Sequence, residues 1–189
     1  MHEGLLFVLS SPSGTGKTTV ARKLAEADKN CVLSVSHTTR SARKNEVHGK
    51  DYFFVHRDEF EKMTREGRFL EWAEFQEEFY GTTHDFVKKT LEAGKDVILI
   101  IDVKGAKQVK EKYPGSISIF LLPPSVEELK KRLRNRETEG EEETERRLGI
   151  ASWEQEQAKN YDYRVVNDKI ETTVEEVLSI IRAEREKRK

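Results

Sequence analysis

A glycine-rich loop between an apolar segment and a helical segment constrains the fold of this chain more than any other feature of the sequence. The apolar segment Leu5–Ser10 predicts a buried strand, and Lys17–Ala27 has the residue spacing of a helix. The loop and the first residues of the helix closely follow the pattern G-x-x-x-x-G-K-[ST], although Ser11 replaces the strict first glycine. A strand, a tight loop and a helix in this order are typical of the first unit of an α/β fold.

The loop has the chemistry of a phosphate-binding site. Gly14 and Gly16 allow backbone N–H groups to curl around phosphate oxygens, and the positive end of the following helix points at the same place. The Lys17 side chain can reach the β- and γ-phosphates of a nucleotide, and the Thr18 hydroxyl can bind Mg²⁺. The alternative is a turn without a ligand, but Gly-x-Gly-Lys-Ser/Thr should occur by chance in roughly one chain of this size in a hundred. We therefore expect nucleotide phosphates to bind at this loop.

The remaining apolar residues fall into short blocks that alternate with segments of helical spacing. The further strands predicted are Cys31–Ser36, Asp96–Ile101, Ser116–Leu122 and Arg164–Asn167. The helices predicted around them include Asp85–Ala93, Ala106–Tyr113, Ser125–Asn135 and a last one from Thr173. Short apolar strands joined by helices favour an α/β fold with a mostly parallel, buried sheet that is flanked by helices. A chain of 189 residues is expected to form one domain around such a sheet.

This alternation breaks between Arg40 and about Thr83. Aromatic residues are frequent here among many charged ones, which favours a small mixed β insertion into the main fold. Within the insertion, Arg57–Glu66 is predicted to form a short helix that Gly67 ends.

Composition argues against several partners and compartments. Lys plus Arg number 34 and Asp plus Glu 35, so no global field favours nucleic acid or an anionic membrane surface. The longest apolar run, Val97–Ile101, is far shorter than the ~20 residues that cross a bilayer. The single cysteine, Cys31, cannot form an intrachain disulfide, and the first residues do not resemble a signal peptide. We expect a soluble, cytoplasmic protein that binds neither nucleic acid nor membrane.

Two features outside the loop suit phosphate or metal. Arg40 and Arg43 lie three residues apart in a polar stretch after a predicted strand, and guanidinium groups suit a doubly charged phosphate. A solvated basic turn is the alternative, and on these two residues alone it is favoured. Asp102 ends an apolar run, as does the acidic residue that lies near Mg²⁺ in many enzymes with this kind of loop.

Four short motifs follow the loop. They are Gly49-Lys50-Asp51-Tyr52-Phe53-Phe54, Phe69-Leu70-Glu71-Trp72-Ala73, Tyr80-Gly81-Thr82 and Asp102-Val103-Lys104-Gly105. In this order behind this loop, they resemble the guanylate kinase family over essentially the whole chain. The resemblance implies Mg²⁺-dependent phosphoryl transfer from ATP to GMP or dGMP. It also implies a P-loop core of residues 1–35 and 84–189, an inserted GMP-binding region of residues 36–83 and a helical lid at about residues 132–147.

The resemblance assigns roles in both substrate sites. ATP would be contacted by the residues Ser11, Pro12, Ser13, Gly14, Thr15, Gly16, Lys17, Thr18, Thr19 and Asn167, the last of them beside the adenine. The GMP phosphate would be held by Arg40, Arg43, Tyr52 and Tyr80, and the guanine would face Ser36, Glu71, Thr82 and Asp102. Whether Asp102 serves the guanine or Mg²⁺ stays open. The family usually has an acidic residue at the position of Ile100, so the role of that position is open too.

The chemistry of Glu71 supports its place independently of the resemblance. Guanine presents N1–H and N2–H₂ side by side as donors, and one carboxylate can accept both with two parallel hydrogen bonds. Adenine has an acceptor at N1, which a carboxylate repels. The alternative for Glu71 is an ordinary exposed carboxylate on a strand, and the flanking motif argues against it.

Three arginines are candidates for contact with the transferring phosphoryl group. Arg132 and Arg136 are four residues apart on a predicted helix and so share one face, and Arg147 follows an acidic stretch. The resemblance places them in a mobile lid, whereas the residues alone also allow a solvated, salt-bridged helical hairpin. No general base is needed, because the accepting phosphate has a second pKa of about 6 and is largely deprotonated at neutral pH.

Two other functions remain open. A non-catalytic guanylate-kinase-like protein-interaction module would keep the fold without turnover, but the intact loop argues against it. A related sugar-phosphate kinase could share the loop and the lid, but Glu71, Tyr80 and Thr82 argue against that reaction. The sequence leaves the oligomeric state open.

Overall fold

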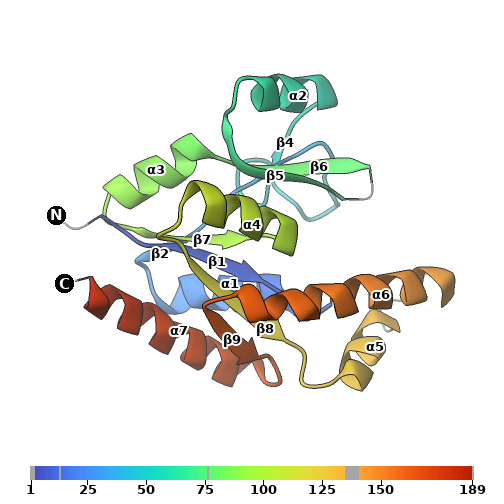
Figure 1. Cartoon of the computed structure of the whole chain (residues 1–189). Helices are drawn as coiled ribbons and strands as arrows, with labels where there is room; N and C mark the ends of the chain where they lie inside the picture. Colours follow the sequence, from blue (N-terminus) through green and yellow to red (C-terminus); the bar gives the residue numbers. More distant parts are fainter. Residues whose placement is uncertain (1–2, 13, 76, 135–140, 189) are drawn as a thin grey trace.

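Two β-sheets organise the chain, which the computed structural model describes at residues 3–12, 14–75, 77–134 and 141–188 (Figure 1). The side chains of residues 132–134, 141–144 and 147 lie outside this description. The larger sheet has five parallel strands in the order β2-β7-β1-β8-β9. Its strands are β1 (Leu6–Ser10), β2 (Cys31–Leu33), β7 (Asp96–Ile100), β8 (Ile117–Leu122) and β9 (Tyr163–Val166). The predicted α/β fold around a parallel sheet is therefore confirmed.

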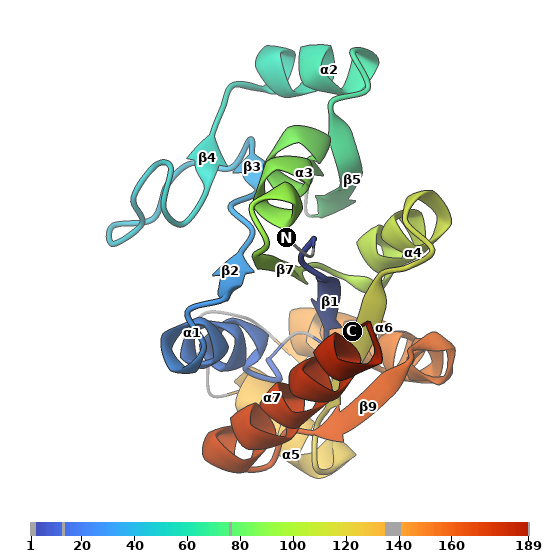
Figure 2. The same ribbon diagram turned by 90° about the vertical axis from the view of Figure 1, so that its left-hand side faces the viewer.

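Helices cover both faces of the larger sheet, with α3 and α4 on one face and α1 and α7 on the other (Figures 1 and 2). Their bounds are α1 (Lys17–Ala27), α3 (His84–Glu92), α4 (Val103–Lys112), α5 (Val126–Arg134), α6 (Glu141–Gln157) and α7 (Ile170–Lys187), with a short 3-10 helix at Ala158–Asn160. In the described part of the chain, no helix has both the length and the apolar character needed to cross a membrane.

The central strand β1 is buried on both of its faces. Phe7 and Leu9 pack into the cluster that includes residues of α1 and α7. Leu6 and Val8 point the other way, into the cluster that includes residues of α3 and α4. Because successive side chains of a strand point to opposite faces, a continuous apolar run is what a strand between two helical layers requires.

The carboxyl ends of the parallel strands meet at one edge of the larger sheet. The phosphate-loop motif follows β1, Asp102 follows β7, and Asn167 follows β9. The neighbours of β1 are β7 on one side and β8 on the other, so the chain changes sides around β1. In open α/β sheets, ligands bind at such a point outside the carboxyl ends of the strands.

The smaller sheet is mixed and has the strand order β4-β3-β6-β5. Its elements are β3 (His37–Thr38), β4 (Phe53–Phe54), α2 (Arg57–Arg65), β5 (Phe69–Phe75) and β6 (Glu78–Thr83). Strand β3 pairs parallel with β4 and antiparallel with β6. Phe60 and Met63 of α2 pack on Phe69 of β5 and give this sheet its own small core. The mixed β structure expected between Arg40 and Thr83 is confirmed.

Several element bounds differ from the prediction; α7, for example, begins at Ile170 and not at Thr173. Two of the differences follow from contacts in the structure. Helix α4 begins at Val103 and not at Ala106, because the Asp102 side chain accepts a hydrogen bond from the Gly105 N–H at 2.8 Å and caps the helix. The second strand ends at Leu33 and not at Ser36, because the chain has already turned toward the smaller sheet by Ser36. There, the Ser36 carbonyl accepts a hydrogen bond from the Phe53 N–H at 2.9 Å.

Arg185 ties the C-terminal helix α7 to the larger sheet. Its Nε donates to Asp96 Oδ2 and its Nη1 to Asp28 Oδ2, each at 2.6 Å. The other oxygen of Asp96 accepts the Leu5 N–H at 2.7 Å. The Asp96 side chain is 3% exposed, so a carboxylate left there without Arg185 would lack its counter-charge in a poorly solvated place.

We expect Arg185→Met to lower the free energy of unfolding by about 3 kcal/mol, because the buried Asp96 carboxylate loses its ion-pair partner. Arg182→Met on the same helix is the matched control, since Arg182 is exposed, and it should change stability by less than about 0.5 kcal/mol. Urea unfolding followed by circular dichroism measures both. Equal midpoints for the two variants would contradict a stabilising role for the Arg185 bridge.

Candidate active site

The loop after β1 forms a cradle at the start of α1. Gly14 and Gly16 have φ angles of 84° and 88°, in the left-handed region where any side chain strains the backbone. Gly16 is also the N-cap of α1, and its carbonyl accepts the Val20 N–H at 3.1 Å. The first N–H groups of a helix have no partner within it, so this loop and helix start present donors to an anion.

Lys17 is the first residue of α1, and its side chain turns back toward the sheet. Its Nζ donates a hydrogen bond to the Ile101 carbonyl at 3.1 Å, just beyond the end of β7. Burial lowers the pKa of the Lys17 ammonium, while the carboxylates of Glu154 and Asp102 act in the opposite direction. The charge of Lys17 is thus held between the loop and two acidic side chains from other elements.

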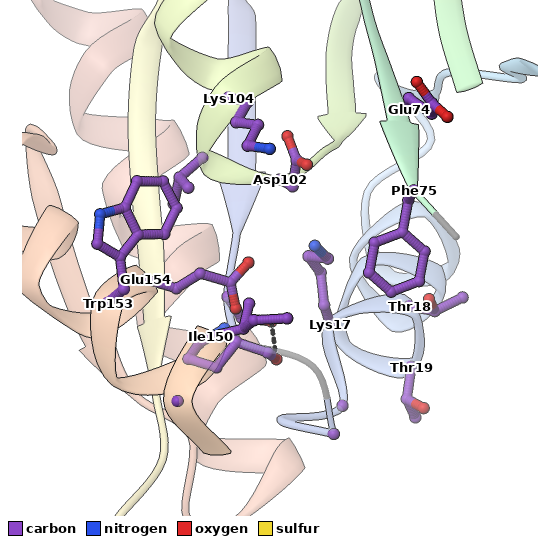
Figure 3. A pocket seen from close by; sticks show the side chains of 16 residues that line it. Lys17, Thr18, Thr19, Glu74, Phe75, Asp102, Lys104, Ile150, Trp153 and Glu154 are labelled. Carbon is purple, nitrogen blue, oxygen red and sulfur yellow. Dashed lines mark hydrogen bonds between the residues drawn. The ribbon is translucent and has the colours of Figure 1, made fainter. Parts of the chain in front are cut away.

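A cavity of about 740 Å³, which we call the loop cavity, opens in front of Lys17 (Figure 3). The side chains of Lys17, Asp102 and Glu154 face this space. Its lining also includes the predicted loop residues and large exposed apolar side chains from α6 and β5. These residues are Ser11, Pro12, Gly14, Gly16, Thr18, Thr19, Phe75, Ile150 and Trp153. The structure therefore brings most of the predicted ATP residues together around one opening.

Glu154 was not predicted from the sequence. It lies on α6, lines the loop cavity and is 8% exposed. The signal that could have found it is the spacing of Ala151, Glu154 and Ala158, all buried, which puts a carboxylate on the inward face of α6 and its 3-10 extension.

Asn167 has a structural role that the sequence did not reveal. It is 1% exposed, its Nδ2 donates to the Thr15 carbonyl in the loop, and its Oδ1 accepts from the Thr173 hydroxyl at 3.0 Å. The side chain thereby connects the phosphate loop to α7. Its predicted contact with an adenine ring stays a prediction. Thr15, another predicted residue, is itself fully buried.

Glu71 of β5 is held in a buried position near Asp102. Its Oε1 accepts the Thr82 N–H at 2.9 Å, and the Thr82 hydroxyl lies 3.0 Å from the Ser36 hydroxyl. Glu71 is 3% exposed. Burial raises the pKa of its carboxyl to about 7, although the hydrogen bonds from Thr82 act in the opposite direction, and the Asp102 carboxylate adds to the rise.

Gly105 explains how α4 comes so close to Glu71. A Cβ atom at position 105 would lie 2.8 Å from Glu71 Oε2 and 3.3 Å from the Ile101 Cβ. A side chain at this position would therefore push the carboxylate or the helix away. The glycine of the Asp-Val-Lys-Gly motif leaves the room that the carboxylate occupies.

A cavity of about 180 Å³, the Glu71 cavity, lies beside the loop cavity and shares three lining residues with it, Lys17, Phe75 and Asp102. Its other walls include Ser36, Glu71, Tyr52, Tyr80 and Ile100. Asp102 thus faces both cavities while it caps α4. Of the residues predicted to face a base, Ser36, Glu71 and Asp102 line this cavity. Thr82 does not line it but contacts both Ser36 and Glu71.

A third cavity, the arginine cavity, has a volume of about 440 Å³ and adjoins the Glu71 cavity through Ser36, Tyr52, Tyr80 and Ile100. Its lining contains both predicted arginines, Arg40 and Arg43, together with Arg22, Lys50, Glu46 and Asp51. Thr18 lines this cavity and the loop cavity. The three cavities are therefore neighbours and lie between the loop and the smaller sheet.

Some predicted residues lie outside the described part of the chain. They are Ser13 and Arg136, together with the side chains of Arg132 and Arg147. Their predicted roles stay predictions.

Comparison with known proteins decides the family. A sequence model of the family described as guanylate kinase matches residues 4–184. This chain belongs to the guanylate kinase family. The guanylate kinase of Lactococcus lactis is 51% identical to it over 183 residues, which cover 97% of this chain and 89% of that protein. The guanylate kinase of Caldanaerobacter subterraneus subsp. tengcongensis is 48% identical with the same coverage. The crystal structure of guanylate kinase from Anaplasma phagocytophilum matches with a TM-score of 0.81 and 40% identity, covering 97% of this chain and 87% of that chain.

In this member of the guanylate kinase family, burial of Glu71 should make stability fall as the pH rises. Below pH of about 4.5 the carboxyl is protonated in both the folded and the unfolded chain. Between pH of about 4.5 and about 7 the unfolded chain releases this proton while the folded chain keeps it, so the unfolded state gains stability. The shift corresponds to about 3 kcal/mol.

The difference in unfolding free energy between Glu71→Gln and the wild type isolates this effect, because the variant has no titrating group there. We expect the difference to move by about 3 kcal/mol in favour of the variant between pH 4 and pH 8. Urea unfolding at a series of pH values measures it. A constant difference across this range would show that the folded protein does not disfavour the Glu71 carboxylate.

Proposed function

We propose that this chain is an ATP-dependent guanylate kinase, which transfers the γ-phosphoryl group of ATP to GMP or dGMP and releases ADP and the nucleoside diphosphate. The observation that carries the proposal is the buried carboxylate of Glu71, in a cavity that shares Lys17 with the loop cavity. The Glu71 cavity would then select the acceptor base, the loop cavity would hold the donor phosphates, and Lys17 lines both cavities.

The base of the acceptor would be recognised by Glu71, Ser36 and Thr82. An ionised Glu71 accepts hydrogen bonds from guanine N1–H and N2–H₂, and both bonds are charge-assisted. The hydroxyls of Ser36 and Thr82, 3.0 Å apart, can donate to or accept from the remaining polar atoms of the base. Adenine would place its N1 acceptor against the carboxylate, so AMP is disfavoured by repulsion as well as by a lost bond.

The phosphate of GMP would bind in the arginine cavity. Arg40 and Arg43 supply positive charge, and Tyr52 and Tyr80 supply hydroxyl donors. Ile100 stands in the wall between this cavity and the Glu71 cavity. We propose that it contributes an apolar contact to the nucleotide at a position where the family usually has an acidic residue.

The donor phosphates would bind at the loop. The N–H groups of the loop and the start of α1 surround phosphate oxygens, and Lys17 neutralises the β- and γ-phosphates. Asn167 supports this arrangement through the Thr15 carbonyl. We keep the contact of Asn167 with adenine as part of the proposal.

The residues present fit a Mg²⁺ ion that binds together with ATP. Mg²⁺ in nucleotide sites takes most of its ligands from phosphate oxygens and water and needs only one or two protein oxygens. The exposed Thr18 at the start of α1 and the carboxylate of Asp102 both line the loop cavity. The described residues contain no cluster of three or more His, Cys, Asp or Glu residues that could hold the ion without the nucleotide. Bound there, Mg²⁺ would neutralise charge on the phosphates.

The reaction needs positioning and charge neutralisation. An oxygen of the GMP phosphate attacks the γ-phosphorus in line, and the bond between that phosphorus and the oxygen bridging to ADP breaks. The attacking oxygen is already deprotonated, so no protein base has to remove a proton. We propose that Arg132, Arg136 and Arg147 close over the transferring group and stabilise its charge together with Lys17.

Different regions of the chain would bind the two substrates. Residues 36–83 would bind GMP, residues 1–35 and 84–189 would form the ATP-binding core, and residues of about 132–147 would act as the lid. Because ATP and GMP are metabolites of the cytoplasm, we propose that the enzyme works there.

The experiment that tests the function measures ADP formation with ATP, Mg²⁺ and one acceptor at a time. GMP and dGMP should give fast turnover, while AMP, CMP, UMP, ribose 5-phosphate and buffer alone should give little. If none of these acceptors gives turnover, the result would favour a protein-interaction module. Preference for the sugar phosphate would overturn the base-selective site.

The same assay in Glu71→Gln tests the residue that carries the proposal. The amide keeps the shape of the side chain, but its NH₂ group must face a guanine donor, so one charge-assisted bond is lost. Since such a bond contributes about 1.5 to 3 kcal/mol, kcat/KM for GMP should fall roughly ten- to a hundredfold. The KM for ATP should barely change, and AMP should improve relative to GMP. An unchanged ratio of GMP to AMP activity would remove Glu71 from base recognition.

A further inference from the structure

Arg40, which lines the arginine cavity, is already engaged by a carboxylate of its own chain. Its Nη2 donates to Glu46 Oε1 at 2.9 Å and its Nη1 to Glu46 Oε2 at 3.0 Å. Nη1 also donates to the Ser41 carbonyl at 2.7 Å. Each of the two side chains is only 18% exposed, so this bidentate pair is part of the packed structure of the loop after β3.

These contacts leave a defined part of the guanidinium group for a ligand. A guanidinium has five N–H donors, and Glu46 and Ser41 use both hydrogens of Nη1 and one of Nη2. Glu46 and Ser41 leave Nε–H and the second hydrogen of Nη2, and the Tyr80 hydroxyl, which also lines the arginine cavity, is a further hydrogen-bond partner of Arg40. These two N–H groups point in parallel along one edge of the guanidinium, which is the arrangement that two oxygens of a phosphate can accept.

The other neighbours of Arg40 place this group at the cavity. The guanidinium carbon lies 5.5 Å from the centre of the Tyr52 ring and 5.9 Å from that of Phe54. The hydrogen bonds with Glu46 raise the pKa of Arg40, and the hydrogen bond with the Tyr80 hydroxyl adds to the rise. Tyr52 and Tyr80 both line the arginine cavity. Arg40 is therefore held on several sides in front of the space for the phosphate.

Glu46 is itself anchored by a turn. The Arg43 N–H donates to Glu46 Oε2 at 2.8 Å, and the Glu46 N–H donates to the Arg43 carbonyl at 3.0 Å. If the carboxylate of Glu46 merely filled the place of a phosphate, it would have to leave when the substrate enters. Leaving would break the side-chain bond that closes this turn and would release Arg43 as well as Arg40. The geometry favours a carboxylate that stays while the substrate is bound.

We propose that Glu46 is a positioning residue, which holds Arg40 and the turn at Arg43 so that the Nε and Nη2 edge of the Arg40 guanidinium faces the phosphate of the acceptor nucleotide. The inference rests on the proposed function, because it assigns that phosphate to the arginine cavity. Glu46 acts through the arginines and does not contact the substrate. Its negative charge opposes phosphate binding, but this charge is neutralised by the bidentate contact with Arg40.

Glu46→Gln tests the proposal, because the amide keeps the size of the side chain and places an NH₂ group against a guanidinium donor. We expect the Kd and KM for GMP to rise about tenfold, since Arg40 then turns away from the phosphate. The kcat at saturating GMP and the KM for ATP should change less than twofold. Inhibition by guanosine, which carries the base without the phosphate, should stay the same. The matched control is Glu61→Gln, since Glu61 forms a more exposed pair with Arg57 at 3.3 Å, and this variant should behave as the wild type.

A double-mutant cycle separates positioning from a general disturbance of the loop. Arg40→Met should raise the Kd for GMP more than Glu46→Gln does. Adding Glu46→Gln to Arg40→Met should leave the Kd unchanged or lower it, because without Arg40 the Glu46 carboxylate repels the phosphate. Independent, multiplicative losses, or an equal loss of guanosine binding, would overturn the positioning role. Tighter GMP binding by Glu46→Gln would also overturn it, because the carboxylate would then be a competitor of the phosphate. If the wild type binds and phosphorylates GMP and Glu46→Gln has the same Kd and KM for GMP, this inference alone is refuted. If the wild type does not bind GMP, the proposed function is refuted too.

Discussion

The buried carboxylate of Glu71 imposes the strongest condition on the acceptor site. A carboxylate that is 3% exposed is stable in its ionised form only where hydrogen-bond donors surround it. The protein supplies hydrogen bonds from Thr82, including its N–H at 2.9 Å, and burial still raises the pKa of the carboxyl to about 7. A ligand that brings two further donors therefore stabilises the ionised carboxylate, and guanine is the base that presents them side by side.

The rest of the cleft follows from how this carboxylate is placed relative to the larger sheet. Gly105 lets α4 approach Glu71, and Asp102 caps the same helix while it lines the cavities on both sides. Asp102 follows β7 and lies next to Ile101, whose carbonyl accepts a hydrogen bond from the Lys17 ammonium. The parallel strands bring Lys17 and Asp102 to one edge of the larger sheet, and Glu71 of the smaller sheet lines the same small cavity as these two residues.

The sequence was sufficient for features that depend on local pattern. The order of strands and helices followed from the apolar blocks, and the cradle followed from Gly14, Gly16 and Lys17. The sequence could not show that Glu71 is buried, because burial depends on Gly105, which lies 34 residues later and comes close only in the folded chain. It missed Glu154 for a similar reason, since a charged residue on a helix is usually at the surface. It also missed Glu46, whose carboxylate looks like one more surface charge until the fold brings it against Arg40.

The central claim is that one cleft holds a guanine against Glu71 and two sets of phosphates on either side of Lys17. A crystal structure of the protein with GMP, Mg²⁺ and a non-hydrolysable ATP analogue tests it most directly. The account predicts both Glu71 oxygens within about 3 Å of guanine N1 and N2, the GMP phosphate at Arg40 and Arg43, and the γ-phosphate of the analogue at Lys17. A guanine that lies away from Glu71, or a GMP phosphate outside the arginine cavity, would contradict it.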